Sequence, residues 1–164
     1  MKNLLIMRHA KSDWGSDSQT DFDRPLNERG LKSAPLMGKE LARRNKIPGL
    51  IISSPANRAK TTAKLAAESC GYNQNILFEQ EFYFGSIDEI LNIIMAVGNE
   101  YDTIMIVGHN PTSESLIYRL LKEHRHQQMP TAAVASINFN IDEWNQLKPN
   151  SGELEWLIIP RELA

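Results

Sequence analysis

Two histidines follow apolar runs in places where a parallel sheet would bring them together. Leu4 to Met7 is followed by Arg8 and His9, and Thr103 to Val107 is followed two residues later by His109. Ligands of open α/β sheets collect at the carboxyl ends of the strands, so neighbouring strands would deliver both imidazoles to one crevice. The arginine beside His9 indicates an anionic ligand, and phosphate matches a guanidinium fork.

A second arginine, Arg58, follows another predicted strand, four residues after Ser54 and within the first turn of a predicted helix. A helix N-terminus favours anions, and an arginine there fits phosphate oxygens in a bidentate way. Taken singly, each residue has a simpler interpretation, since histidines after strands are often structural and arginines are normally on the surface. Their combination at matching strand ends favours one anion site.

The elements that would position these residues begin with a buried strand, Leu4 to Met7, because no polar residue alternates within it. A polar loop from residue 10 to 25 follows, and Asn27 is a plausible cap for the next helix. Proline fits a first turn and clashes in a helix interior. We therefore expect Pro35 to split this helix, with Ser33 capping its second piece.

The remaining chain alternates strands and helices, which predicts one domain over residues 1–164. We expect an α/β fold, a three-layer α/β/α sandwich with a mainly parallel central sheet of about six strands, an antiparallel C-terminal hairpin and helices on both faces. The expected elements are a strand at 50–53, a helix from Ala56 to a Gly71 cap, a strand at 76–78, a helix opened by a Ser86–Glu89 capping box, a strand ending at Val107, a helix capped by Asn110 with Pro111 first, and strands at 133–141 and 153–159.

Composition limits the class of protein and its partners. The chain has 164 residues, 41% hydrophobic and 23% charged, with a formal net charge of -2, which sets aside disorder and disfavours nucleic-acid binding. The first apolar run is too short for a signal peptide or a membrane span, so we expect a cytoplasmic protein without membrane association. The single cysteine, Cys70, excludes an internal disulfide.

The candidate residues belong to three motifs that follow one another along the chain. The motifs are Arg8-His9-Ala10-Lys11-Ser12, Ser54-Pro55-Ala56-Asn57-Arg58-Ala59-Lys60-Thr61-Thr62-Ala63 and Val107-Gly108-His109-Asn110-Pro111. In this order they resemble the motifs of the histidine phosphatase superfamily, and within it those of the small SixA-type phosphohistidine phosphatases. Weaker similarity lies in Met129–Ala135 and in Arg24-Pro25-Leu26 with Gly30, and the resemblance extends from Met1 to about Ile159. The superfamily usually has glycine where this chain has Ala10, and mutase-like members have an asparagine where it has Gly15.

The resemblance implies a mechanism in which His9 attacks phosphorus and forms a phosphohistidine intermediate that water hydrolyses. Arg8 and Arg58 would neutralise the phosphoryl oxygens and disfavour the charged form of His9, while His109 donates to a phosphoryl oxygen. Phosphoryl transfer needs alignment and charge stabilisation, so we expect neither a metal nor another cofactor.

Substrate choice depends on the leaving group, because an alkoxide needs a proton from an acid whereas imidazole can leave neutral. The first hypothesis is therefore a phosphatase for phosphohistidine on a phosphorylated protein. A second is a phosphomonoesterase for a small phosphorylated metabolite with Glu81 as general acid, and a third is an inactive module that binds phosphoproteins. Arg24 either contacts substrate or anchors its loop. The sequence does not indicate an oligomeric state.

Metal binding is the weaker interpretation of the histidines. His124 and His126 lack acidic or cysteine partners at the usual zinc spacing, so we expect a solvated loop there. His9 and His109 could share a zinc ion, but two arginines in the same crevice would repel it.

Overall fold

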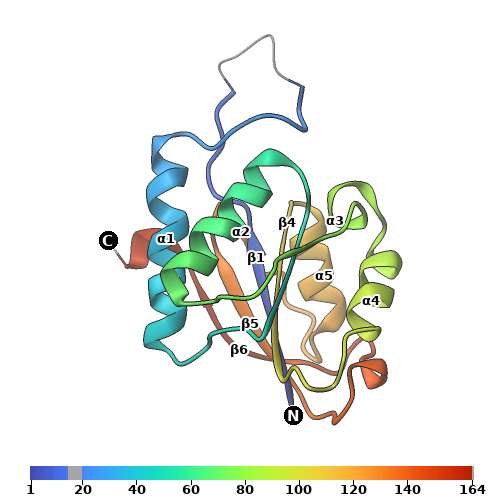
Figure 1. Ribbon diagram of the computed structural model, residues 1–164. Coiled ribbons are helices and arrows are strands. Elements are labelled where there is room, and N and C mark those ends of the chain that lie inside the picture. Colours follow the sequence, from blue (N-terminus) through green and yellow to red (C-terminus); the bar gives the residue numbers. More distant parts are fainter. Residues whose placement is uncertain (15–19, 164) are drawn as a thin grey trace.

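The computed structural model describes residues 1–14 and 20–163, and its elements follow the alternation expected from the sequence (Figure 1). In chain order they are β1 (Lys2–Arg8), α1 (Glu28–Arg43), β2 (Leu50–Ser53), α2 (Asn57–Cys70), β3 (Leu77–Phe78), α3 (Glu81–Phe84), α4 (Ile87–Met95), β4 (Thr103–Gly108), α5 (Thr112–Leu120), β5 (Val134–Phe139), η1 (Trp144–Gln146), β6 (Glu153–Ile158) and η2 (Pro160–Glu162).

The central sheet has six strands in the order β3-β2-β4-β1-β5-β6. The first four strands of this order pair in parallel, whereas β5 runs antiparallel to both β1 and β6. The predicted mainly parallel sheet with an antiparallel C-terminal hairpin is therefore confirmed. In the β1–β4 register Arg8 lies opposite Gly108, so the histidine that follows each strand emerges at the same level of the sheet.

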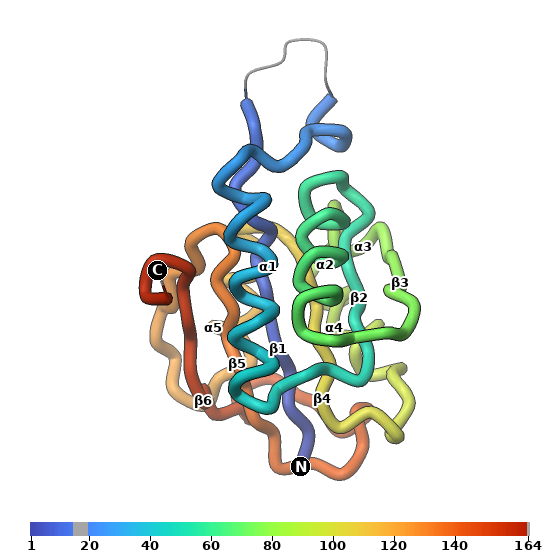
Figure 2. The backbone as a smooth tube through the Cα atoms, turned by 60° about the vertical axis from the view of Figure 1, so that its left-hand side comes forward, coloured from blue at the N-terminus to red at the C-terminus, as the bar shows by residue number. Residues whose placement is uncertain are grey.

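Side chains of β1 alternate between two cores, one on each face of the sheet. Leu5 and Met7 pack with residues of α1 and α2, while Leu4 and Ile6 pack with residues of α4 and α5. Figure 2 shows α1 and α2 side by side on one face, and the structure is thus the predicted three-layer sandwich. The two helices pack closely enough that a Cβ at Gly38 would overlap Ser69 and Ala66 of α2.

Helix α1 is continuous through Pro35, so the predicted split at this residue is wrong. The predicted cap is confirmed, since the Asn27 side chain accepts a hydrogen bond of 3.0 Å from the Gly30 N–H. Ser33 caps nothing and instead donates to the Gly30 carbonyl. Proline removes one helical hydrogen bond, but buried Ala34 and Met37 on either side pack against α2 and hold the two pieces in one helix.

The predicted capping role of Asn110 is also wrong. Helix α5 begins at Thr112 without a side-chain cap, and Asn110 Nδ2 donates to the Met129 carbonyl at 2.9 Å and to Glu114 Oε2 at 2.5 Å. Tertiary partners therefore compete successfully with the local cap. The short helix α3 was not expected, whereas the Ser86–Glu89 capping box and the left-handed Gly71, with φ of 88°, are as predicted. Among the helices of the described ranges, none has the length and apolar character to cross a membrane.

Candidate active site

The four residues singled out from the sequence meet at one cavity of about 450 Å³, beyond the carboxyl ends of β1 and β4. Strand ends supply Arg8, His9 and His109, and the first turn of α2 supplies Arg58. The described residues that line the cavity are Arg8, His9, Lys11, Ser12, Trp14, Asp21, Arg24, Arg58, His109, Asn110 and Thr131. Four of these side chains are cationic and one is a carboxylate, so the lining favours an anion.

His9 is held as a neutral imidazole with a defined tautomer. Its Nδ1 lies 2.7 Å from the carbonyl oxygen of Ala10, which can only accept, so Nδ1 carries the proton and Nε2 keeps a lone pair. Burial lowers the pKa of His9 to about 4, helped by Arg58 and Arg8 and opposed by the bond to Ala10. The ring is therefore uncharged at neutral pH and Nε2 is free to act as a nucleophile.

The loop after His9 is fixed to helix α2. The Ala10 N–H donates to Thr62 Oγ1 at 2.9 Å, and the Thr62 hydroxyl donates to the Arg58 carbonyl at 2.6 Å. Ala10, Thr62 and Arg58 are all buried. Ala10, whose carbonyl orients His9, is thus bonded to the helical turn that carries Arg58. These bonds couple the position of the His9 ring to that of the Arg58 side chain.

The second histidine lies against the first, with ring centroids 5.2 Å apart. His109 Nε2 is 2.8 Å from Ser54 Oγ, and Nδ1 is buried without a hydrogen-bond partner among the described residues. Burial lowers the pKa of His109 to about 3, with further lowering by His9 and Arg58. A dianion in the cavity would offset these effects and favour the charged form of the ring.

Three arginines converge on the cavity with unused donors. The Nε atoms of Arg8, Arg24 and Arg58 are each buried without a partner within the part of the chain that the structure describes. Their terminal nitrogens are held, for example by the bond of 3.1 Å from Arg8 Nη1 to the Met129 carbonyl. The three guanidinium groups line the same cavity, and this gathering of positive charge favours an anionic ligand.

Arg24 has contacts that fit both of its interpretations. It lines the cavity, and its guanidinium also donates to Ser12 Oγ and to Asp21 Oδ1, the latter at 3.2 Å. The ring of Trp14 stacks on the guanidinium, whose carbon lies 3.6 Å from the ring centroid. Arg24 therefore anchors its loop and also lines the cavity, and its contact with substrate stays a prediction.

Glu81 is not brought together with the other predicted residues. It begins α3 and is absent from the described lining of the cavity, so its role as a general acid stays a prediction. The residue of α3 that does reach the site is Tyr83, whose ring packs edge-on against His109 with centroids 5.5 Å apart.

Sequence reasoning missed two residues, Asp21 and Tyr83. Tyr83 Oη donates to Asp21 Oδ2 at 2.6 Å, and Arg58 Nη2 donates to the same oxygen at 3.1 Å. The partners are 62 and 37 residues from Asp21 along the chain, so no local pattern could have indicated them. Gly15, where mutase-like proteins have asparagine, lies outside the described residues.

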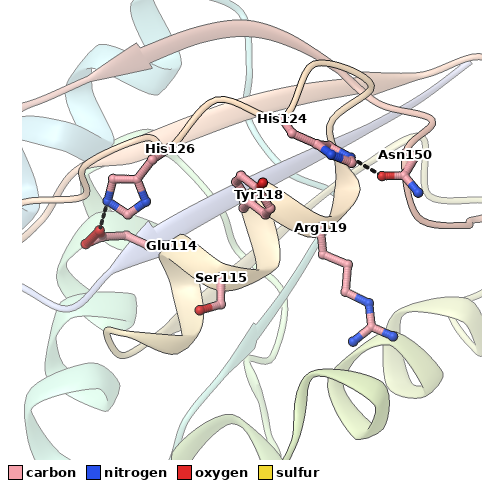
Figure 3. A pocket seen from close by; sticks show the side chains of 7 residues that line it. All are labelled: Glu114, Ser115, Tyr118, Arg119, His124, His126 and Asn150. Carbon is pink, nitrogen blue, oxygen red and sulfur yellow. Dashed lines mark hydrogen bonds and ion pairs between the residues drawn. The ribbon is translucent and has the colours of Figure 1, made fainter.

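The other two histidines line a separate cavity of about 510 Å³ beside α5 (Figure 3). Both are exposed, and they point to different partners: His126 Nε2 lies 3.0 Å from Glu114 Oε1, while His124 bonds Asn150. Over residues 1–14 and 20–163, no three His, Cys, Asp or Glu side chains group in a way that could hold a metal ion.

Comparisons with known proteins agree with the fold, and the family match spans the first two of the three motifs. Residues 4–88 match the sequence model of the histidine phosphatase superfamily (branch 1). The structure of the protein histidine phosphatase SixA complexed with tungstate superposes with a TM-score of 0.86 at 21% identity, covering 99% of both chains. A candidate phosphohistidine phosphatase SixA from Agrobacterium tumefaciens gives 0.83 at 27% identity, covering 97% of this chain and 98% of that one. The uncharacterized protein Rv1276c of Mycobacterium tuberculosis is 27% identical over 94% of this chain and its own full length.

Proposed function

The chain belongs to the histidine phosphatase superfamily (branch 1), and from this membership we propose that it is a phosphatase that transfers a phosphoryl group to His9 and then to water. The observation that carries the proposal is the bond from His9 Nδ1 to the Ala10 carbonyl. This bond fixes the proton on Nδ1 and leaves the lone pair of Nε2 for attack on phosphorus.

In the first step Nε2 of His9 forms a bond to phosphorus as the bond to the leaving group breaks. The arginines Arg8, Arg24 and Arg58 and the ring of His109 bind the equatorial phosphoryl oxygens, whose charge they stabilise. In the second step water attacks phosphorus, the electron pair of the N–P bond returns to Nε2, and both water protons leave with the phosphate. Because Nδ1 keeps its proton throughout, His9 departs as a neutral imidazole.

We propose phosphohistidine on a protein as the substrate. An ester would need a positioned acid, and Asp21, the single carboxylate in the described lining, has its pKa lowered to about 2, first by the hydrogen bond from Tyr83. It is ionised at neutral pH and has no proton to donate to an alkoxide. The imidazole of phosphohistidine leaves without that help. The SixA name of the Agrobacterium relative supports the same substrate class.

The test compares phosphate release from a phosphohistidine protein with release from sugar and glycerate phosphates. We expect the phosphohistidine protein to be hydrolysed with a kcat/KM at least a hundredfold above that of the esters, an order of magnitude typical of one well-placed catalytic proton. His9→Ala should abolish release, whereas His124→Ala, at an exposed histidine of the second cavity, should leave it unchanged. Preferential hydrolysis of esters that is lost in Glu81→Gln would instead support the esterase. Binding of the phosphoprotein without any release would support the inactive module.

A further inference from the structure

A carboxylate lies beside the arginines of the predicted anion site, and phosphoryl transfer to His9 gives it no role. Asp21 lines the cavity, and its two oxygens accept from Arg24, Arg58 and Tyr83 at 3.2, 3.1 and 2.6 Å. Its backbone carbonyl accepts a further bond of 2.7 Å from Arg58 Nη1. A carboxylate repels a phosphoryl dianion, so its place among the arginines needs a compensating function.

The Asp21 carboxylate is held in position yet still open to a further partner. An ionised carboxylate offers about four acceptor positions, and Arg24, Arg58 and Tyr83 occupy three of them. The side chain is 54% exposed, although the guanidinium groups that it contacts are buried. The remaining acceptor position is therefore accessible to a group that enters the cavity with the substrate.

The partner must be a donor or a cation, because the carboxylate can only accept. Phosphohistidine provides such a donor: the ring nitrogen that does not carry the phosphoryl group must be protonated if imidazole is to leave neutral. His9 illustrates the requirement, since its own departure as neutral imidazole depends on the proton that the Ala10 carbonyl holds on Nδ1. Esters such as phosphoserine or phosphoglycerate have no equivalent group on the leaving oxygen, and phosphoglycerate carries a carboxylate that Asp21 would repel.

We propose that Asp21 is a specificity-determining residue that accepts a hydrogen bond from the protonated ring nitrogen of a phosphorylated imidazole and so favours phosphoramidates over anionic phosphate esters. The inference rests on the proposed function and adds a reason for its substrate class. As Nε2 of His9 bonds to phosphorus, the substrate P–N bond breaks and its electron pair stays on the departing nitrogen. The proton on the other nitrogen stays in place, bonded to Asp21, and the leaving imidazole is neutral.

The experiment measures kcat/KM of wild type and Asp21→Asn on phosphoimidazole and on 3-phosphoglycerate. A charge-assisted hydrogen bond contributes about 1.5–3 kcal/mol, so the ratio of the two kcat/KM values should fall by about tenfold to a hundredfold. Asp21→Glu should restore the preference for phosphoimidazole, because it keeps the charge. If Asp21→Asn does not fold, Asp21→Ser removes the same charge, and the ratio should fall by a similar factor. Tyr83→Phe keeps the carboxylate but removes one of its hydrogen bonds, and it should retain most of the ratio.

Asp23→Asn is the matched control, since it removes one negative charge from the same loop at an exposed carboxylate that bonds Thr20. It should leave both kcat/KM values unchanged. Equal losses on both substrates in Asp21→Asn would mean that Asp21 only positions Arg24 and Arg58. Equal gains on both, with tighter inhibition by inorganic phosphate, would mean that it merely occupies the anion site. Either result overturns the inference while leaving the proposed function intact, whereas a wild type that hydrolyses only 3-phosphoglycerate overturns the proposed function itself.

Discussion

Lowering the pH from 7 to 5 should destabilise the folded protein through its two buried histidines, His9 and His109. The pKa of His9 is lowered from 6.5 to about 4 and that of His109 from 6.5 to about 3, in both cases mainly by burial. At pH 7 both rings are neutral in the folded protein and mainly neutral in the unfolded chain. As the pH falls below 6.5, the unfolded chain binds protons that the folded protein excludes, so the free energy of unfolding decreases.

The size of this loss of stability follows from the difference between pH 5 and the pKa of 6.5 in the unfolded chain. The difference is about 1.5 units, so each histidine should lower the free energy of unfolding by about 2 kcal/mol at pH 5. Both rings are at most 9% exposed, which limits screening by solvent. The pKa values of Asp21 and Glu40 are lowered to about 2, so these carboxylates lose their stabilising effect mainly as the pH falls below their ordinary values of 3.8 and 4.5, and they contribute little between pH 7 and pH 5.

The assay is urea denaturation at pH 7 and pH 5 in buffer without phosphate, for wild type, His9→Gln, His109→Gln and the exposed control His124→Gln. The difference in free energy of unfolding between the two pH values should be about 2 kcal/mol smaller in each active-site variant than in wild type. The control should match wild type. If His9→Gln and His109→Gln both keep the full wild-type difference, the rings are not buried as neutral groups and the reasoning is wrong.

Three further predictions concern single side chains. Arg58→Lys removes the fork that bonds the carbonyl and carboxylate of Asp21, and we expect kcat/KM to fall about a hundredfold in a phosphatase assay; a loss of less than tenfold would contradict a bidentate role. Glu81→Gln should keep phosphohistidine hydrolysis within about twofold of wild type, because an imidazole leaving group needs no external acid, and a large loss would restore Glu81 as a general acid. Gly30→Ala places a Cβ against the backbone oxygen of Lys11, and we expect it to lower the free energy of unfolding, measured by urea denaturation, by about 1–3 kcal/mol. An unchanged midpoint would show that the loop after His9 can move away from the added methyl group.

The sequence could predict the helix caps and the buried strands, because these features depend on residues close together in the chain. Asn27, Gly71 and the Ser86–Glu89 box act where the pattern of apolar and capping residues places them, because their partners lie within one helical turn. The strands that end at Arg8 and Gly108 were recognisable as buried runs, and their parallel pairing brings the two histidines to one cavity. The assignment of the whole chain to one domain stays a prediction.

Long-range packing decides the features that sequence reasoning missed or misjudged. Pro35 does not break α1, because the buried side chains of the helix pack against α2. Rules based on neighbouring residues do not take this contact into account. Asn110 does not cap α5, because its side-chain amide donates instead to the Met129 carbonyl and to Glu114. Asp21 appears in the sequence as one more polar loop residue, and only its distant partners Arg58 and Tyr83 make it part of the site.

The central claim is that Nε2 of His9 accepts the phosphoryl group. It is tested most directly by mixing the protein with phosphoimidazole, quenching with base within the first turnover, since phosphohistidine is labile to acid, and locating the phosphoryl group by peptide mass spectrometry. We predict that it is found on His9, that it disappears as inorganic phosphate is released, and that it is absent in His9→Ala. Steady turnover with no phosphoryl group on His9, or with the group on His109 instead, would contradict the account.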